Sequence, residues 1–164
     1  MNARELRAKQ QPLKRQYRED PPTAMATLHA KGCLHQDRVA VQIISDAVGR
    51  EVGLHPATGG DGSFACSGDL VLEALAACAG VTLLAVATAM DIPIKSGTVK
   101  AEGDLDFRGT LGVAKDVPVG FQTIRLHFDL DTEAEERQME TLLRLTERYC
   151  VVHQTLSHPP DLSV

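Results

Sequence analysis

Polar side chains dominate the first stretch of the chain, where charged and amide residues follow one another from position 2 to 19, interrupted by Pro12. A proline pair stands at 21–22, and because proline cannot continue a helix, we expect a helix to end before it. The pattern therefore predicts a polar helical arm over residues 1–22, followed by a separate domain over residues 23–164.

Short segments rich in β-branched and apolar residues follow the arm and predict strands. The clearest is 39–44, where alternate positions would share one face of a sheet. A second strand is expected over 24–30, with a turn over 31–37, and a third over 50–55. The glycine-rich stretch 56–68 is predicted to be a loop.

The longest apolar stretch, residues 70–90, predicts one long helix that is buried on most of its sides. Ser67 suits the N-cap, Asp69 suits the positive end of the helix, and Pro93 ends it. Dense alanine and an internal Glu73 favour a close-packed helix of a soluble protein over a membrane span.

Two longer alternating runs, 99–107 and 122–130, predict a pair of strands that each bury one face. Thr132 is followed three residues later by glutamate, the capping-box spacing, and we expect a second helix to begin there. The end of the chain, 151–164, is expected to finish in a short edge strand. The inner stripe of the second helix is predicted to be Met139, Leu142, Leu143, Thr146, Tyr149 and Cys150.

This order of elements predicts an α+β fold with the sheet and the helices in separate layers. A long helix that is apolar nearly all round needs more covering surface than the rest of one chain easily supplies. We therefore expect two copies to share a core as a homodimer.

Composition and charge narrow the classes of function. With 43% hydrophobic and 24% charged residues, the chain resembles ordinary globular proteins. Its net charge is −5, and no lysine or arginine cluster lies beside aromatic residues, which argues against a nucleic-acid partner. The basic run 9–18 is closed by two acidic residues and is typical of a solvated helix face. No signal peptide or membrane segment is predicted, so we expect a cytoplasmic protein.

Four cysteines in a cytoplasmic chain are more often reactive, metal-binding or simply buried than paired in structural disulfides. Cys78 lies midway along the long helix, and Cys150 lies on the inner stripe of the second one. Each alone is more typical of a core residue, whose burial should raise the pKa of the thiol. Both face inward in a layered fold, so the pair is a candidate for a shared site, although a disulfide needs Cα atoms about 4.4–6.8 Å apart.

Other candidate residues are weaker. Cys33, in the predicted turn, is expected to have no chemical role. Cys66, in the predicted loop, is at most a third redox thiol. His55 with Cys66 lacks the paired ligand spacing of a zinc site, so no metal is expected. His153 and His158 follow Cys150 closely and are candidates to assist its thiol.

Two segments resemble the OsmC/Ohr family, named for osmotically inducible protein C and organic hydroperoxide resistance proteins. The segment SGDLVLEALAAC at 67–78 is similar to the helix that carries the first family cysteine. The segment ERYCVVHQTL at 147–156 is similar to the helix end that carries the second. Both the order and the separation of the two segments agree with the family, as do the paired strands between them.

The resemblance implies antiparallel sheets wrapped around long central helices in an intertwined homodimer. It also implies a thiol peroxidase, in which Cys78 reduces organic hydroperoxides and becomes a sulfenic acid that Cys150 converts to a disulfide. An external dithiol, such as a lipoylated protein, would restore both thiols. No cofactor is implied. The family also uses an arginine to stabilise the thiolate, and Arg38 is our candidate for it.

The chain departs from the family pattern at three places. Gly68 stands where the family has the glutamate that pairs with the arginine, and Val151 and His153 replace a proline and a serine after the second cysteine. The lost glutamate favours an alternative, a non-peroxidase OsmC-fold protein that binds a small apolar ligand or senses redox state. A structural dimer with incidental cysteines is a third interpretation.

Overall fold

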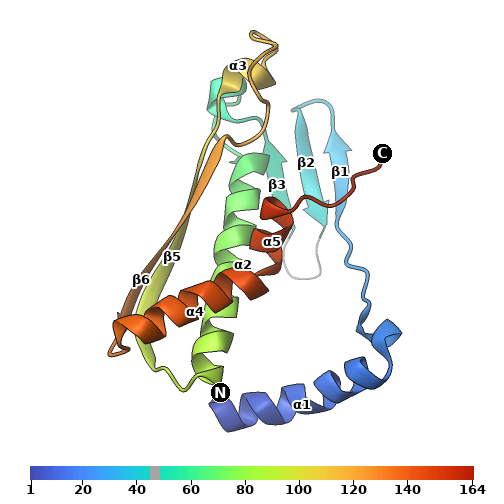
Figure 1. Cartoon of the computed structure of the whole chain (residues 1–164). Helices are drawn as coiled ribbons and strands as arrows, with labels where there is room; N and C mark the ends of the chain where they lie inside the picture. Colours follow the sequence, from blue (N-terminus) through green and yellow to red (C-terminus); the bar gives the residue numbers. More distant parts are fainter. Residues whose placement is uncertain (45–48) are drawn as a thin grey trace. The chain divides into compact units, whose positions relative to one another are not determined.

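The computed structural model describes residues 1–44 and 49–164 (Figure 1). Its chain divides into two compact units. The first unit comprises residues 1–27, 74–100 and 127–164, and the second unit comprises residues 28–73 and 101–126.

The chain contains both helices and strands, and consecutive strands pair antiparallel in β1-β2 and β2-β3, which confirms the predicted α+β class. The helices are α1 (Ala3–Glu19), α2 (Ser67–Ala89), α3 (Phe107–Thr110), α4 (Glu136–Tyr149) and α5 (Val151–Ser157), with short 3-10 turns η1 (Pro21–Ala24) and η2 (Pro56–Thr58). The strands are β1 (Lys31–His35), β2 (Ala40–Ile44), β3 (Arg50–Gly53), β4 (Ala65–Cys66), β5 (Ile94–Asp104) and β6 (Thr123–Thr132).

The predicted N-terminal helix is present as α1. Asn2 caps it, because its side chain accepts the Glu5 N–H at 2.9 Å while the Glu5 carboxylate accepts the Asn2 N–H at 3.1 Å. Pro12 lies inside the helix without ending it, and no residue of α1 is buried. A domain boundary between residues 22 and 23 stays a prediction.

The second unit contains a four-stranded sheet in the order β1-β2-β3-β4. The first two pairings are antiparallel, as expected. The pairing of β3 with β4 is parallel, which differs from the expected antiparallel sheet. The predicted strand at 24–30 is also wrong, because the partner of β2 is residues 31–35. Gly32 had indicated a turn there, yet it sits opposite Ile43, and a Cβ on it would lie 2.6 Å from a Val41 methyl group.

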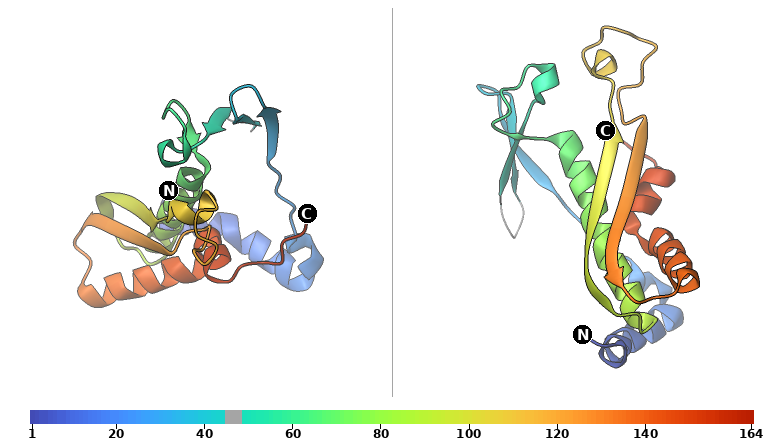
Figure 2. Two further views of the ribbon diagram at one scale, coloured as in Figure 1. Left: turned by 90° about the horizontal axis from the view of Figure 1, so that it is seen from above. Right: turned by 90° about the vertical axis from the view of Figure 1, so that its left-hand side faces the viewer.

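The two long strands pair with each other and lie side by side in every view (Figure 2). At one end of the strand pair, the Gln122 N–H donates a hydrogen bond to the Asp104 carbonyl at 2.9 Å. At the other end the Thr132 hydroxyl donates to the Pro93 carbonyl at 2.7 Å, which makes the pair antiparallel. Half-buried and exposed side chains alternate along β6, as the sequence pattern predicted.

The core of the first unit is built from Leu83, Ala87, Ile92 and Leu142, so the C-terminal part of α2 packs against α4. The buried residues of α2 form a single stripe at four-residue spacing, namely Leu75, Ala79, Leu83 and Ala87. Val81 and Leu84, on other faces, are 69% and 54% exposed. Burial on most sides is therefore not achieved within one chain.

The second half of the chain also departs from three expectations. Thr132 ends β6, and α4 begins four residues later, capped by a capping box between Glu135 and Gln138. The predicted C-terminal edge strand is replaced by α5, because Cys150 caps a new helix. On α4 the predicted inner stripe holds for Leu142, Thr146 and Cys150 but fails at Tyr149, which is 57% exposed.

Candidate functional site

Cys78 and Cys150 meet inside the first unit. Cys78 lies at the middle of α2, and Cys150 joins α4 to α5, where its residue is only 1% exposed. Both are free thiols, and the Cys150 thiol donates a hydrogen bond to the Cys78 sulfur. The structure thus brings together the two cysteines that were the candidate pair.

The position of Cys150 follows from its double role as a helix cap. Its extended backbone, with φ −74° and ψ 109°, ends α4 and starts α5. Its N–H donates to the Thr146 carbonyl at 2.9 Å, which closes α4, and its carbonyl accepts the Gln154 N–H at 2.9 Å, which opens α5. Its sulfur accepts the His153 N–H at 3.5 Å, so the thiol itself caps α5. The sharp change of direction leaves the first N–H groups of α5 facing the two sulfurs.

The environment of Cys78 favours the thiolate. Burial alone would raise the pKa of the Cys78 thiol, but hydrogen bonds outweigh it and hold this pKa below its ordinary value. The donors are the Val152 N–H, the Cys150 thiol, the Val151 N–H and the Thr82 hydroxyl. Our expectation of a raised pKa at this mid-helix thiol was therefore wrong, because it neglected donors from another helix.

Cys150 is shifted in the opposite direction. Burial is the largest cause that raises the pKa of the Cys150 thiol, and the hydrogen bond donated to Cys78 and the charge on Cys78 raise it further. The N–H groups of His153 and Val152 oppose this shift without cancelling it. One thiol of the pair is thus prepared to ionise first, while the other keeps its proton.

Sequence reasoning missed the donors that distinguish the two thiols. Backbone N–H groups carry no side-chain signature, so their aim cannot be predicted from spacing. One signal was nevertheless present, namely the departure from the family proline at Val151. Proline has no N–H, whereas Val151 has one and donates it to Cys78.

Arg38 belongs to the second unit and lies in the turn just before β2. Its guanidinium forms an ion pair with Glu51 at 2.5 Å, and its side chain is 43% exposed. A second ion pair in the same unit joins Arg50 to Glu73. A role of Arg38 at Cys78 stays a prediction.

The weaker candidates are placed as follows. Cys33 is exposed on β1, and Cys66 lies in the short strand β4, so neither is in the irregular segment where it was expected. His153 has a buried Nδ1 that finds no hydrogen-bond partner among the described residues. Among the residues that the structure describes, no group of three or more His, Cys, Asp or Glu side chains could hold a metal.

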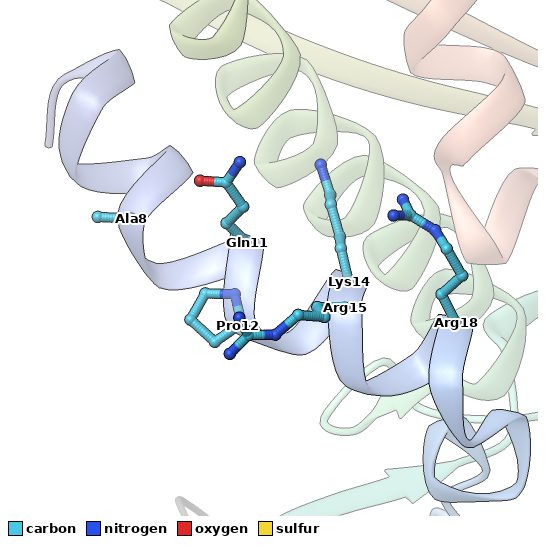
Figure 3. A pocket seen from close by; sticks show the side chains of 6 residues that line it. All are labelled: Ala8, Gln11, Pro12, Lys14, Arg15 and Arg18. Carbon is cyan, nitrogen blue, oxygen red and sulfur yellow. The ribbon is translucent and has the colours of Figure 1, made fainter.

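A hollow of about 490 Å³ lies along α1 and is lined by Ala8, Gln11, Pro12, Lys14, Arg15 and Arg18 (Figure 3). All six residues belong to one helix, and all are exposed. Lys14 and Arg18 project from the same face of this helix (Figure 3). This surface fits the solvated basic face predicted from the sequence and carries no enclosed site.

Comparison with solved structures shows the same fold. An OsmC-like protein from Mycoplasma pneumoniae matches with a TM-score of 0.69 and 21% identity, over 82% of this chain and 89% of that one. The organic hydroperoxide resistance protein OsmC from Legionella pneumophila matches with a TM-score of 0.63 and 18% identity, over 82% of this chain and 91% of that one. OhrB of Bacillus subtilis, also an organic hydroperoxide resistance protein, matches with a TM-score of 0.56 and 19% identity, over 83% of this chain and 96% of that one.

No curated protein matches the sequence. The family model described as OsmC-like protein matches residues 60–164, which is more than half of the chain and includes both Cys78 and Cys150. The matched segment agrees with the two motifs that suggested the OsmC/Ohr resemblance. The chain therefore belongs to the OsmC-like protein family.

Proposed function

We propose that this protein is a thiol-dependent peroxidase that reduces organic hydroperoxides to alcohols, with Cys78 as the attacking thiol and Cys150 as the resolving thiol. The observation that carries the proposal is the contact between the two thiols beside the first N–H groups of α5, an arrangement that lowers the pKa of Cys78 while burial raises the pKa of Cys150. Fold neighbours named for organic hydroperoxide resistance support the choice of substrate.

In the first step the Cys78 thiolate attacks the terminal oxygen of the hydroperoxide. An S–O bond forms, the O–O bond breaks, and the departing alkoxide takes a proton to become the alcohol. The N–H groups of Val151 and Val152 hold the thiolate in place for this attack. Cys78 is left as a sulfenic acid, so the sulfur has been oxidised and the peroxide reduced by two electrons.

In the second step Cys150 loses its proton and attacks the Cys78 sulfur. The S–S bond forms as the sulfenic hydroxyl leaves as water. A resolving thiol with a raised pKa suits this order, because it stays protonated while Cys78 reacts with peroxide. An external dithiol, such as a lipoylated protein, then reduces the disulfide by thiol–disulfide exchange.

The proposal includes three features beyond the dithiol. The enzyme acts as a homodimer in the cytoplasm, and Arg38 supplies a cation near Cys78 at some stage of the cycle. The arginine of the family pairs with a glutamate, but this chain has Gly68 at the position of that glutamate. Glu51 gives Arg38 a carboxylate partner instead. Arg38→Ala should slow peroxide consumption, whereas Arg50→Ala, which breaks the pair with Glu73, should not.

The experiment is consumption of cumene hydroperoxide with dithiothreitol as reductant. Wild type should turn over, Cys78→Ser should be inactive, and Cys150→Ser should complete one turnover and then accumulate a sulfenic acid on Cys78, trapped by dimedone. Cys33→Ser removes an exposed thiol on β1 and is the matched control with unchanged activity. Dimedone labelling of Cys150, or turnover by Cys78→Ser, would overturn the assignment of roles.

The alternative function is ligand binding or redox sensing on the same fold, and the glycine at position 68 is the observation that favours it. A protein that only binds a ligand would consume no peroxide, and a sensor would form the Cys78–Cys150 disulfide once but would be reduced by dithiothreitol too slowly for multiple turnovers. The turnover assay therefore separates the two functions directly.

A further inference from the structure

A cavity of about 350 Å³ lies wholly within the second unit, and no step proposed for Cys78 uses it. It lies beside the first turn of α2, between the chain around η2 and the segment that follows β5. Its principal walls are His55, Cys66, Leu72, Leu105, Phe107 and Phe121. The volume lies in the range of small-molecule sites, and apolar and aromatic side chains form most of the lining.

Two glycines open this space. A Cβ on Gly68 would lie 3.4 Å from the Phe121 ring, 3.6 Å from the Cys66 sulfur and 3.6 Å from a Leu105 methyl group. A Cβ on Gly103 would lie 2.5 Å from the Phe121 ring. Gly68 is also the position where the family has its glutamate. A glutamate there would extend into the cavity, so the same departure that removes the family carboxylate creates the room.

The wall of the cavity contains a hydrogen-bond donor, His55. The His55 ring stacks on Phe107, with ring centroids 4.7 Å apart and 16° between the planes. The His55 Nδ1 accepts the Ala57 N–H at 3.0 Å, so the proton of the neutral ring resides on Nε2. Among the described residues the Nε2 atom has no hydrogen-bond partner, and its N–H is free to bind an acceptor on a ligand.

The charges at the cavity decide which ligands fit. Asp69 is exposed at the rim, and Asp104 forms an ion pair with Arg125, whose charge it neutralises. Among the residues that the structure describes, no lysine or arginine lines the cavity to balance an anion. An anionic ligand would thus be repelled by Asp69, while an uncharged ring would contact Phe107, Phe121 and Leu72.

We propose that this cavity binds a small uncharged aromatic ligand that carries a carbonyl or ether oxygen, with the ring against Phe107 and Phe121 and the oxygen accepting the His55 Nε2–H. A hydrogen bond between neutral groups contributes about 1 kcal/mol, which corresponds to roughly fivefold in affinity. The carboxylate analogue of the same ring should bind far more weakly because of Asp69.

The test is titration of the full-length, ¹⁵N-labelled protein, with Cys78→Ser in place so that peroxidase chemistry plays no part. Acetophenone, ethylbenzene and benzoate are the probes, because they share one ring and differ in a single group. Acetophenone should shift the Gly68 and Gly103 amide signals and saturate, ethylbenzene should bind about fivefold more weakly, and benzoate should not bind. His55→Phe should remove the preference for acetophenone over ethylbenzene.

Gly68→Glu fills the cavity and should abolish the acetophenone shifts, whereas Ser67→Glu adds the same charge one residue earlier, outside the lining, and should leave them unchanged. Leu72→Trp fills the cavity from another wall and replaces Gly68→Glu if that variant does not give a folded spectrum. Equal binding of benzoate, shifts that survive the filling variants, or no saturable shift of Gly68 and Gly103 would each overturn the proposal. Because Cys78 is absent throughout, a negative result leaves the peroxidase proposal intact.

Discussion

At the residue scale, the N–H of Val151 follows from a departure of the chain from the OsmC/Ohr motif, which implies a proline after the second cysteine. It is one of two backbone donors from the start of α5 that lower the pKa of Cys78. Donors fixed by a helix cost no side-chain ordering, so they stabilise a thiolate even when no cation is at hand. The identity of a residue that contributes only its backbone thus affects the chemistry of a neighbouring side chain.

Val151→Pro is expected to raise the pKa of Cys78. Position 151 is the first residue of α5, where proline is well tolerated, so the helix should remain while one donor is lost. Hydrogen bonds to charged groups contribute about 1.5–3 kcal/mol, and alkylation of Cys78 by iodoacetamide at pH 7 should slow by roughly tenfold or more. Peptide mass spectrometry measures the rate, and Val151→Ala, which keeps the N–H, should react like wild type. Equal rates in the two variants would contradict the role of this donor.

The opposite shifts of the two thiols predict separated pH profiles. A lowered pKa means that Cys78 ionises at a lower pH than an ordinary thiol, and a raised pKa means that Cys150 ionises at a higher one. As pH rises, alkylation should reach Cys78 first and Cys150 later, measured site by site in the reduced protein. Cys33, which is exposed, provides the reference in the same sample. A reversed order would contradict the assignment of the attacking thiol.

The two cysteines themselves could be predicted as a candidate pair because helical spacing places both on inward faces. Their activation could not be predicted in the same way. Thr82 follows Cys78 by one helical turn and was readable in principle, but Val151 and Val152 act through groups that every residue possesses. Their direction depends on the backbone angles of Cys150, which are set by two helices meeting at that residue.

At the element scale, strong periodicity was predictive and weak local signals were not. The alternation along β6 and the extent of α2 could be read from the sequence, because one face or one stripe must be buried. The segment 151–164 was expected to finish in a short edge strand, but the structure has the helix α5 there, which the Cys150 sulfur caps. Strand β1 was missed because Gly32 suggests a turn, while its pairing with β2 is tertiary.

The packing of α4 against α2 can be tested with a cavity-forming substitution. Leu142 is fully buried in the cluster with Leu83 and Ala87. Leu142→Ala should lower the free energy of unfolding by about 2–5 kcal/mol, measured by urea denaturation. Arg144→Ala, on the exposed side of the same helix, is the control and should change it by less than about 0.5 kcal/mol. A small loss for Leu142→Ala would show that α4 does not pack as described.

At the scale of the whole molecule, one chain leaves several apolar side chains of α2 exposed to solvent. Among the described residues it is the one helix long and apolar enough to cross a membrane by length and composition, a test that core helices of soluble proteins also pass. In the proposed homodimer, the exposed apolar faces of α2 are the surface that a partner would cover. A second copy of the chain is the simplest such partner.

We expect sedimentation velocity to show a dimer at micromolar concentration, with an interface well above the standard size of about 1,600 Å². Val81→Asp and Leu84→Asp place a charge on exposed apolar faces of α2 and should each weaken the dimer. Ala8→Asp makes the same type of change at an exposed position of α1 and should leave it intact. A monomeric wild-type protein, or a dimer indifferent to all three substitutions, would contradict a shared core.

The narrow buried stripe of α2 also has a kinetic consequence. A chain that folds alone can bury only this stripe, so its intermediate would keep a row of apolar side chains in contact with water. The last stage of refolding would then be an encounter between two chains, and its rate would rise with protein concentration instead of staying constant. At high dilution this encounter becomes slow, and during that delay the half-assembled chain is the species most exposed to aggregation and to proteases.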